Sequence, residues 1–151
     1  MMYEMKAIGQ VRNAHSERKD VGWGTDISDI VLLEEYKGGL KGLEDFSHAI
    51  IVYYLHEARF DATKHLQRRP QNREDLPCVG IFSQRGKDRP NQIGMTTVEI
   101  VNVSEGQLTV KGLDAIANTP ILDIKPYYPM YDLKEQATVP AWVMELMKNY
   151  F

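Results

Sequence analysis

The sequence is poor in cysteine and has no long apolar run, and both absences exclude classes of protein. Cys78 is the only cysteine among the 151 residues, which rules out a disulfide within the chain and a cysteine-rich metal site. The longest apolar run, residues 49–55, is far shorter than the roughly 20 residues that a membrane-spanning helix needs. The first residues contain no apolar core of a signal peptide. We therefore expect a cytoplasmic protein.

Common enzyme motifs are missing as well. The sequence contains no GxGxxG motif after a strand, no GxxxxGK(S/T) loop and no GxSxG elbow, which are the signatures of dinucleotide-binding proteins, P-loop proteins and hydrolases. No HExxH pattern occurs and the histidines lack the spacing of metal ligands, so we predict no metal. Cys78 has no evident histidine partner, which favours a buried structural cysteine over a nucleophile.

The chain also lacks an excess of positive charge. Its formal net charge of −3 argues against nucleic-acid binding through bulk electrostatics. Basic side chains nevertheless cluster between residues 59 and 73, where Asp61 is the only acidic residue. The cluster consists of Arg59, Lys64, His65, Arg68, Arg69 and Arg73. Its charge alone is compatible with a solvated polar loop or with an RNA-binding surface.

Short runs of β-branched and aliphatic residues between polar or glycine-containing segments predict about seven strands. They lie at residues 6–12, 29–35, 47–55, 79–83, 95–103, 107–113 and 121–125. The run at 47–55 is typical of a strand buried on both faces, residues 104–106 indicate a hairpin turn, and broken alternation indicates a bulge near Ile100. No long amphipathic helix separates the strands, so the pattern argues against a doubly wound sheet and favours an antiparallel barrel or sandwich.

The C-terminal residues carry the one helical pattern of any length. Thr138 can cap a helix, Pro140 is tolerated in its first turn, and an apolar stripe recurs on one face. The stripe consists of Trp142, Leu146 and Tyr150. We expect it to pack on the barrel or on a second subunit. The length and composition fit a single domain, residues 1–151.

Two loops concentrate residues that are suited to ligands. Residues 82–94 combine three cations with glycine and proline between predicted strands, as in an anion site or in a solvated hairpin loop. In residues 113–129, Asp114 suits a turn or a ligand contact. Asp123 and Lys125 share a strand face, where an ion pair is expected. His56, just after the strand at 47–55, suits a structural hydrogen bond or a site at the strand end.

Short motifs that match those of a known protein family extend over nearly the whole chain. They lie at residues 8–12, 42–48, 56, 80–82, 85, 89–91, 93–94, 112–114, 119–120 and 123–127. Together they resemble the TrmO, or TsaA-like, family of S-adenosylmethionine-dependent tRNA methyltransferases. The sequence departs from the family pattern at Gly86, Gln92, Ala117 and Asn118; at Gln92 familiar members have proline, and at Asn118 they have glycine.

The resemblance implies a mainly β fold, a small antiparallel β-barrel with a short C-terminal helix, which works as a homodimer. It implies methylation of the exocyclic nitrogen of threonylcarbamoyl-adenosine, next to the anticodon of tRNA. The alternative is an S-adenosylmethionine-binding sensor or interaction module that transfers no methyl group to tRNA. The implied cofactor contacts are Trp23, Gly24, His56, Glu57, Arg85, Met95, Gly112, Leu113, Asp114 and Ala115.

The chemistry of the implied substrate suggests further roles. Its target nitrogen belongs to a urea-like group and is a poor nucleophile unless a proton is removed or the reactants are held in line. Asp114, Asp123 and Tyr127 are the candidates for a proton acceptor or positioning group. Because a bidentate arginine suits the threonyl carboxylate, we assign that contact to Arg89. The other predicted substrate contacts are Asn91, Lys125 and, for anticodon-arm phosphates, Arg68 and Arg69.

Overall fold

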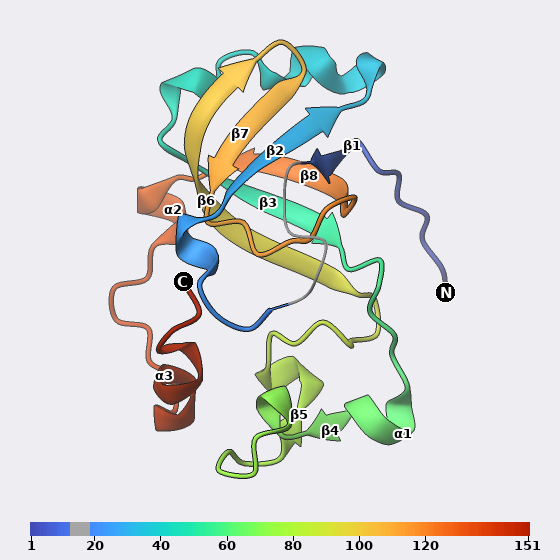
Figure 1. The fold of residues 1–151 in the computed structure, drawn as a ribbon, viewed down its shortest axis with the longest axis vertical. Helices are drawn as coiled ribbons and strands as arrows, with labels where there is room; N and C mark the ends of the chain where they lie inside the picture. Colours follow the sequence, from blue (N-terminus) through green and yellow to red (C-terminus); the bar gives the residue numbers. More distant parts are fainter. Residues whose placement is uncertain (13–18) are drawn as a thin grey trace.

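The computed structural model describes residues 1–12 and 19–151. Six antiparallel strands form a closed barrel in the order β1-β2-β7-β6-β3-β8, which fills the upper part of Figure 1. The strands are β1 (Gly9–Arg12), β2 (Ile27–Leu32), β3 (His48–Tyr54), β6 (Ile93–Ser104), β7 (Gln107–Lys111) and β8 (Pro120–Pro126). The predicted antiparallel barrel is confirmed.

The barrel core is made by alternating side chains. In β3, Ala49, Ile51 and Tyr53 are buried, whereas Ile50 and Val52 between them are only partly buried. Successive strand residues point to opposite faces, so one face of β3 forms the core and the other forms the outer wall. The prediction that this strand is buried on both faces is therefore wrong.

The hairpin turn and the β-bulge predicted from sequence are both present. β6 and β7 pair on either side of the turn at Gly106, whose φ of 72° suits glycine. The pairing of these strands shifts register between Ile100 and Asn102, which confirms the bulge predicted near Ile100. The strand predicted at 29–35 ends at Leu32, because the chain then turns into the 3-10 helix η2 (Glu34–Leu40), with Tyr36 N–H donating to Leu33 C=O.

Residues 55–92, here called the lobe, leave the barrel between β3 and β6 and form its lower extension in Figure 1. The lobe contains α1 (Ala62–His65), the paired strands β4 (Gln67–Arg68) and β5 (Val79–Gly80), and the 3-10 helices η4 (Pro70–Asn72) and η5 (Ile81–Ser83). The strand predicted at 79–83 is thus cut short, because the chain turns at η5 to bury Ile81. Cys78 is exposed, so its predicted burial is wrong.

The C-terminal segment returns to the barrel after two short helices, α2 (Pro129–Asp132) and α3 (Ala141–Met147). Pro140 occupies the N-cap position of α3 and no side chain caps this helix, so the predicted cap at Thr138 is wrong. Gly22 and Trp23, at the 3-10 helix η1 (Trp23–Thr25), donate backbone hydrogen bonds to Asn149 and Tyr150. Of the predicted stripe, Tyr150 thus packs within its own chain, against the loop that leads into β2, and the packing of Trp142 and Leu146 stays a prediction.

Candidate functional site

Three hydroxyl groups converge on the carboxylate of Asp114, which follows β7. The hydroxyl of Tyr53 donates to Oδ1 over 2.9 Å, and the hydroxyl of Thr96 donates to the same oxygen. The hydroxyl of Tyr150 donates to the other oxygen, Oδ2, over 2.6 Å. Tyr53 comes from β3, Thr96 from β6 and Tyr150 from the C-terminal segment, so four separate parts of the chain meet at this cluster. We call these four residues the Asp114 cluster.

Both tyrosines of the Asp114 cluster are held in the protonated form. Burial and the charge of Asp114 raise the pKa of Tyr53, against weaker opposing effects of the Thr96 hydroxyl and the Arg85 cation. Burial and the same carboxylate also raise the pKa of Tyr150. Protonated hydroxyls can donate, so the cluster presents a carboxylate whose two oxygens are both oriented by the protein.

A glycine makes room for one member of the cluster. Gly94 lies opposite Tyr53 in the β3–β6 pairing, and a Cβ at this position would lie 2.3 Å from a ring carbon of Tyr53. Such a contact is impossible without moving the ring. The glycine of the Ile93-Gly94 motif therefore allows the Tyr53 ring to lie against β6.

The loop around η1 lies beside the cluster and is fixed by other parts of the chain. Gly112 N–H donates to the carbonyl of Asp26 over 2.9 Å, and a Cβ on Gly24 would lie 2.6 Å from the backbone of Phe151. Trp23 is 3% exposed, with its indole N–H donating to Lys19 C=O and the Lys19 ammonium 4.8 Å from its ring. The buried ring of Trp23 anchors this loop.

Among the residues predicted at positions 112–115, the side chain of Asp114 is the one that is not fully buried. Gly112, Leu113 and Ala115 are buried, and Leu113 belongs to the barrel core. Nη2 of Arg85, in the loop before β6, donates to Met95 C=O over 2.5 Å, and the Arg85 side chain is exposed. Met95 pairs with Val52, so its exposed side chain lies on the outer face of the barrel, as that of Asp123 does. Asp114 and the exposed Arg85 thus leave side-chain atoms open to a ligand in this region.

His56 and Glu57 lie in a turn at the end of β3, at the start of the lobe. Gln92 braces this turn, because its side-chain amide donates to the carbonyls of Leu55 and Ala58 over 3.0 and 2.7 Å. Its backbone carbonyl also accepts from Leu55 N–H over 2.8 Å. The turn that carries His56 is therefore tied directly to the loop before β6.

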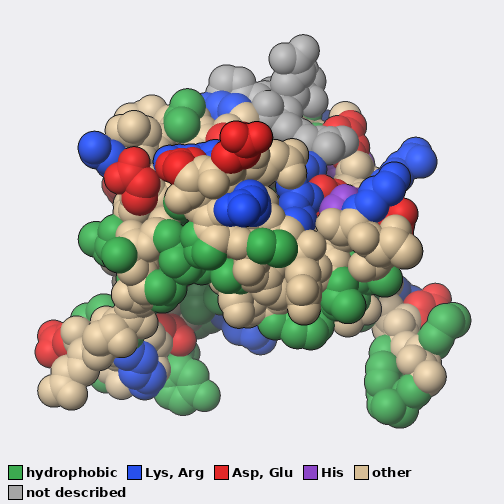
Figure 2. Space-filling view, turned by 90° about the horizontal axis from the view of Figure 1, so that it is seen from below, with side chains coloured by type: hydrophobic (Ala, Val, Ile, Leu, Met, Phe, Trp, Pro, Cys, Tyr) green, Lys and Arg blue, Asp and Glu red, His purple; other side chains and the backbone are tan. Residues whose placement is uncertain are grey.

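The arginines of the lobe are mostly bonded within it. Arg68 lies 3.4 Å from Asp88, and Arg69 donates to the carbonyls of Glu74 and Leu76. Arg89 donates from Nη1 to the carbonyls of Gln84 and Gly86 over 3.0 and 3.3 Å. Hydrogen bonding and nearby cations lower the pKa of Asp88 despite its partial burial. On the face drawn in Figure 2, basic side chains are interspersed with acidic ones above a band of hydrophobic side chains.

Asp123 and Lys125 form the expected ion pair, with 2.7 Å between the ammonium and the carboxylate, but they lie apart from the Asp114 cluster. Asp123 pairs with Val52, whose side chain points away from the core that contains Tyr53. Tyr127 follows β8, and its ring lies edge-on to His48 at 6.3 Å. The side chains of Asp123 and Tyr127 therefore lie on the outer face of the barrel. The carboxylate of Asp114 instead meets Tyr53 and Thr96, whose side chains are buried inside it.

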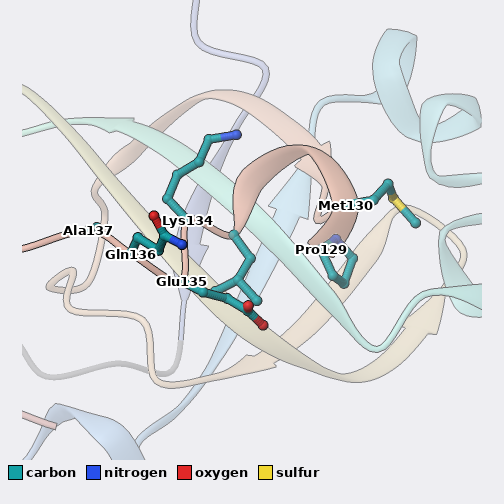
Figure 3. A pocket seen from close by; sticks show the side chains of 7 residues that line it. Pro129, Met130, Lys134, Glu135, Gln136 and Ala137 are labelled. Carbon is teal, nitrogen blue, oxygen red and sulfur yellow. The ribbon is translucent and has the colours of Figure 1, made fainter.

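Two surface hollows flank α2. One of about 490 Å³ is lined by Pro129, Met130 and residues 133–137, as Figure 3 shows. The other, of about 580 Å³, is lined by Tyr127 and by the stacked rings of Phe46 and Tyr128, among other residues. No predicted cofactor residue lines either hollow.

Sequence reasoning missed three members of the Asp114 cluster. Tyr53 lies within an apolar run and was assigned to the core, Thr96 lies in a strand, and Tyr150 was assigned to a packing stripe. One signal was available, since a tyrosine in a buried strand needs a hydrogen-bond partner for its hydroxyl. The identity of that partner depends on tertiary contacts.

Comparison with known proteins identifies the family. Residues 17–133 match the family described as the tRNA-methyltransferase O N-terminal domain. The chain belongs to the TrmO family. Residues 17 and 18, at the start of this match, belong to the segment 13–18 that lies outside the described part of the structure.

Relatives support the assignment over most of the chain. A probable S-adenosyl-L-methionine-binding protein of Pyrococcus abyssi is 35% identical over 148 residues, which are 95% of this chain and 77% of that one. The human tRNA (adenine(37)-N6)-methyltransferase is 36% identical over 110 residues, covering 73% of this chain and 24% of that one. A crystal structure of TrmO from Pseudomonas aeruginosa matches with a TM-score of 0.76 and 26% identity, over 94% of this chain and 62% of that one.

Two departures from the TrmO pattern have visible structural consequences. Asn118, where familiar members have glycine, has a φ of 67°, and asparagine is among the residues that tolerate this left-handed conformation. Gln92, where familiar members have proline, has a φ of 51°. Proline is fixed near −65°, so this loop differs in conformation at Gln92 from a TrmO chain with proline there.

Two other kinds of feature are absent from the described part of the chain. Residues 1–12 and 19–151 contain no group of three or more His, Cys, Asp or Glu side chains arranged to hold a metal ion. Over the same ranges, every helix is too short or too polar to cross a membrane.

Proposed function

We propose that this TrmO-family chain binds S-adenosyl-L-methionine at the Asp114 cluster and methylates the exocyclic nitrogen of threonylcarbamoyl-adenosine next to the anticodon of tRNA. The observation that carries the proposal is the oriented carboxylate of Asp114, which lies in a motif shared with the family. The names of the Pyrococcus and human relatives support the cofactor and the class of reaction.

The side chains around the cluster fit the chemical groups of this cofactor. A carboxylate such as Asp114 accepts hydrogen bonds from an ammonium group or from ribose hydroxyls, and the exposed guanidinium of Arg85 suits a carboxylate. When bound, the cofactor supplies an electrophilic methyl group on a sulfonium.

Asp114 is better suited to holding a ligand than to removing a proton. A carboxylate has about four lone-pair positions, and the hydroxyls of Tyr53, Thr96 and Tyr150 fill three of them. The remaining position can accept one further hydrogen bond. We therefore assign Asp114 to cofactor binding and leave proton transfer to Asp123 or Tyr127.

Cofactor binding by Asp114 and proton transfer by Asp123 or Tyr127 can be combined only in a homodimer. Asp123 and Tyr127 lie on the outside of the barrel wall, so they cannot reach the Asp114 cluster of their own chain. They serve as proton acceptor or positioning group only if the outer wall of one chain meets the Asp114 end of another. Lys125, held 2.7 Å from Asp123, would then also lie beside the substrate.

Arg89 and Asn91 are proposed to bind the substrate nucleoside. The two observed bonds of Arg89 engage Nη1, and the guanidinium carries three further N–H donors on Nε and Nη2. These donors form the fork that matches the threonyl carboxylate. Arg68 and Arg69 would contact anticodon-arm phosphates from the lobe, in addition to their bonds within it.

The test begins with calorimetric titration of the purified chain with S-adenosyl-L-methionine, repeated on Arg85→Ala. Saturable binding that is weakened in the variant supports the cofactor site. Methyl transfer is then measured on tRNA with and without the threonylcarbamoyl group. Transfer only to the modified tRNA supports the full proposal, whereas cofactor binding without transfer to either tRNA identifies a binding module instead. An intact chain that binds no cofactor contradicts the proposal.

A further inference from the structure

The carboxylate of Asp114 is held by the barrel on one side and by the C-terminal segment on the other. Tyr53 and Thr96, both from barrel strands, donate to the same oxygen, Oδ1. The torsion that rotates a carboxylate about its last bond is soft, so donors on one oxygen leave the plane of the group poorly defined. The bond from Tyr150 to Oδ2 fixes that plane.

Tyr150 is itself held in place on several sides. Its backbone carbonyl accepts from Trp23 N–H over 2.8 Å, and its own N–H donates to Met147 C=O over 3.1 Å. The ring lies edge-on to Phe151 at 4.9 Å, and Phe151 in turn fits against Gly24, where a Cβ would collide with its backbone. The Tyr150 hydroxyl is therefore presented by an anchored segment.

Tyr150 also joins two parts of the chain that the family resemblance assigns to the cofactor. Its backbone bonds the loop at Trp23 and Gly24, and its side chain bonds Asp114. The match to the family's N-terminal domain covers residues 17–133, so Tyr150 lies outside that match. The connection is visible only in the folded chain.

We propose that Tyr150 is a positioning residue for cofactor binding: it sets the orientation of the Asp114 carboxylate, so the C-terminal segment completes the site. The inference rests on the proposed function, since it takes S-adenosyl-L-methionine as the ligand of Asp114. Removing the hydroxyl while keeping the ring is expected to weaken binding of that cofactor and to leave the fold intact.

The test is calorimetric titration of Tyr150→Phe with S-adenosyl-L-methionine. A lost hydrogen bond to a charged group predicts a dissociation constant about tenfold higher than that of the unmodified chain. Tyr131→Phe is the matched control, because Tyr131 is also in the C-terminal part of the chain and is 75% exposed. The control is expected to bind as tightly as the unmodified chain. Thermal unfolding followed by circular dichroism checks that both variants fold.

A double-mutant cycle separates positioning from a general structural role. If Tyr150 acts through Asp114, then Tyr150→Phe in an Asp114→Asn background changes affinity much less than it does alone. Equal binding by Tyr150→Phe and the unmodified chain overturns the inference, and so does an equal loss in both backgrounds. If the unmodified chain binds no cofactor, the proposed function itself has failed. If it binds and Tyr150→Phe binds equally, only the role of Tyr150 has failed.

Steady-state kinetics give a further readout on a substrate tRNA. A positioning role at the cofactor site predicts a higher KM for S-adenosyl-L-methionine with an unchanged KM for tRNA. A rise in the KM for tRNA alone would contradict the assignment of Tyr150 to the cofactor side.

Discussion

The Asp114 cluster and the lobe both contain a carboxylate with several partners, but the partners are of different kinds. Around Asp114 the partners are neutral hydroxyls, drawn from two barrel strands and the C-terminal segment. Around Asp88 the partners are the cations of Arg68 and Lys87 and the backbone N–H of Arg59, all from the lobe itself. Hydroxyl donors leave the charge of Asp114 uncompensated, whereas the cations compensate that of Asp88.

This difference indicates a ligand-binding role for Asp114 and a structural role for Asp88. A carboxylate that is oriented but not neutralised can still attract a cation or a hydroxyl of a ligand, and the half-buried position of Asp114 strengthens such an interaction. A carboxylate that is already paired with arginine and lysine mainly holds its surroundings together. We therefore expect changes at Asp114 to alter ligand binding and changes at Asp88 to alter local structure.

The largest effect is expected from Asp114→Asn. The amide is close in shape but has no charge, so the variant should lose about 1.5–3 kcal/mol of cofactor binding free energy, the usual range for a hydrogen bond to a charged group. Asp88→Asn is the matched change in the lobe and should leave cofactor affinity unaltered. Calorimetry with S-adenosyl-L-methionine measures both. Comparable losses in the two variants would remove the distinction between the two carboxylates.

Gly94→Ala should destabilise the fold by about 1–3 kcal/mol, the usual cost of overpacking. Its new methyl group would enter the space of the Tyr53 ring, at 2.3 Å from a ring carbon. Gly86→Ala in the lobe is the control, because a Cβ there has its nearest neighbour at 3.9 Å. Denaturant unfolding of both variants measures the difference, and a Gly94→Ala variant as stable as the unmodified chain would show that the Tyr53 ring is free to move.

The barrel could be predicted from sequence because its strands are local patterns. Alternation in the strand at 107–113 and the apolar run at 47–55 lie within short segments. The pairing of β6 with β7 follows from the turn between them, whereas β3 pairs with β6 and β8, which are distant in sequence. The strand predicted at 79–83 is too long, because this run has the composition of a strand although Ile81 is buried in the lobe after a turn. Composition does not distinguish these two ways of burying an apolar side chain.

The candidate site could be predicted only in part. Asp114 and Arg85 were found through the family resemblance, but the bond between Asp114 and Tyr150 joins residues 36 positions apart with no pattern between them. The contacts of the lobe arginines could not be predicted either. The basic run was compatible with a polar loop or an RNA-binding surface, and it gave no sign that Arg68 pairs with Asp88, 20 residues along the chain. Such pairings arise from tertiary contacts and leave no local signal.

As the pH is raised, the stabilisation by the Asp114 cluster should be lost at a lower pH than that by the lobe. The pKa of Tyr53 is raised in the folded state above its ordinary value of 10.0, so above that pH the unfolded chain loses a proton that the folded chain keeps. The stabilisation is complete below pH 10 and falls as pH rises, by about 1.4 kcal/mol per pH unit for one tyrosine. Tyr53→Phe should reduce this slope, and Tyr131→Phe, at an exposed position, should not. Urea unfolding between pH 9 and pH 11 measures the slopes; equal slopes in the two variants would contradict the assignment to Tyr53.

The smallest effect is expected where the lobe joins the barrel, at Gln92→Gly. Glycine accepts the φ of 51° found at this position, so the substitution removes only the side-chain bonds to Leu55 and Ala58 and should cost about 1 kcal/mol of stability. Hydrogen exchange should show faster opening of the turn at residues 55–58, with unchanged protection in the strands of the Asp114 cluster. Gln92→Pro should cost more, because proline cannot adopt that φ. If proline instead stabilised the chain, the loop would adopt another conformation in that variant, and the bonds from Gln92 to the turn at residues 55–58 would not be needed for stability.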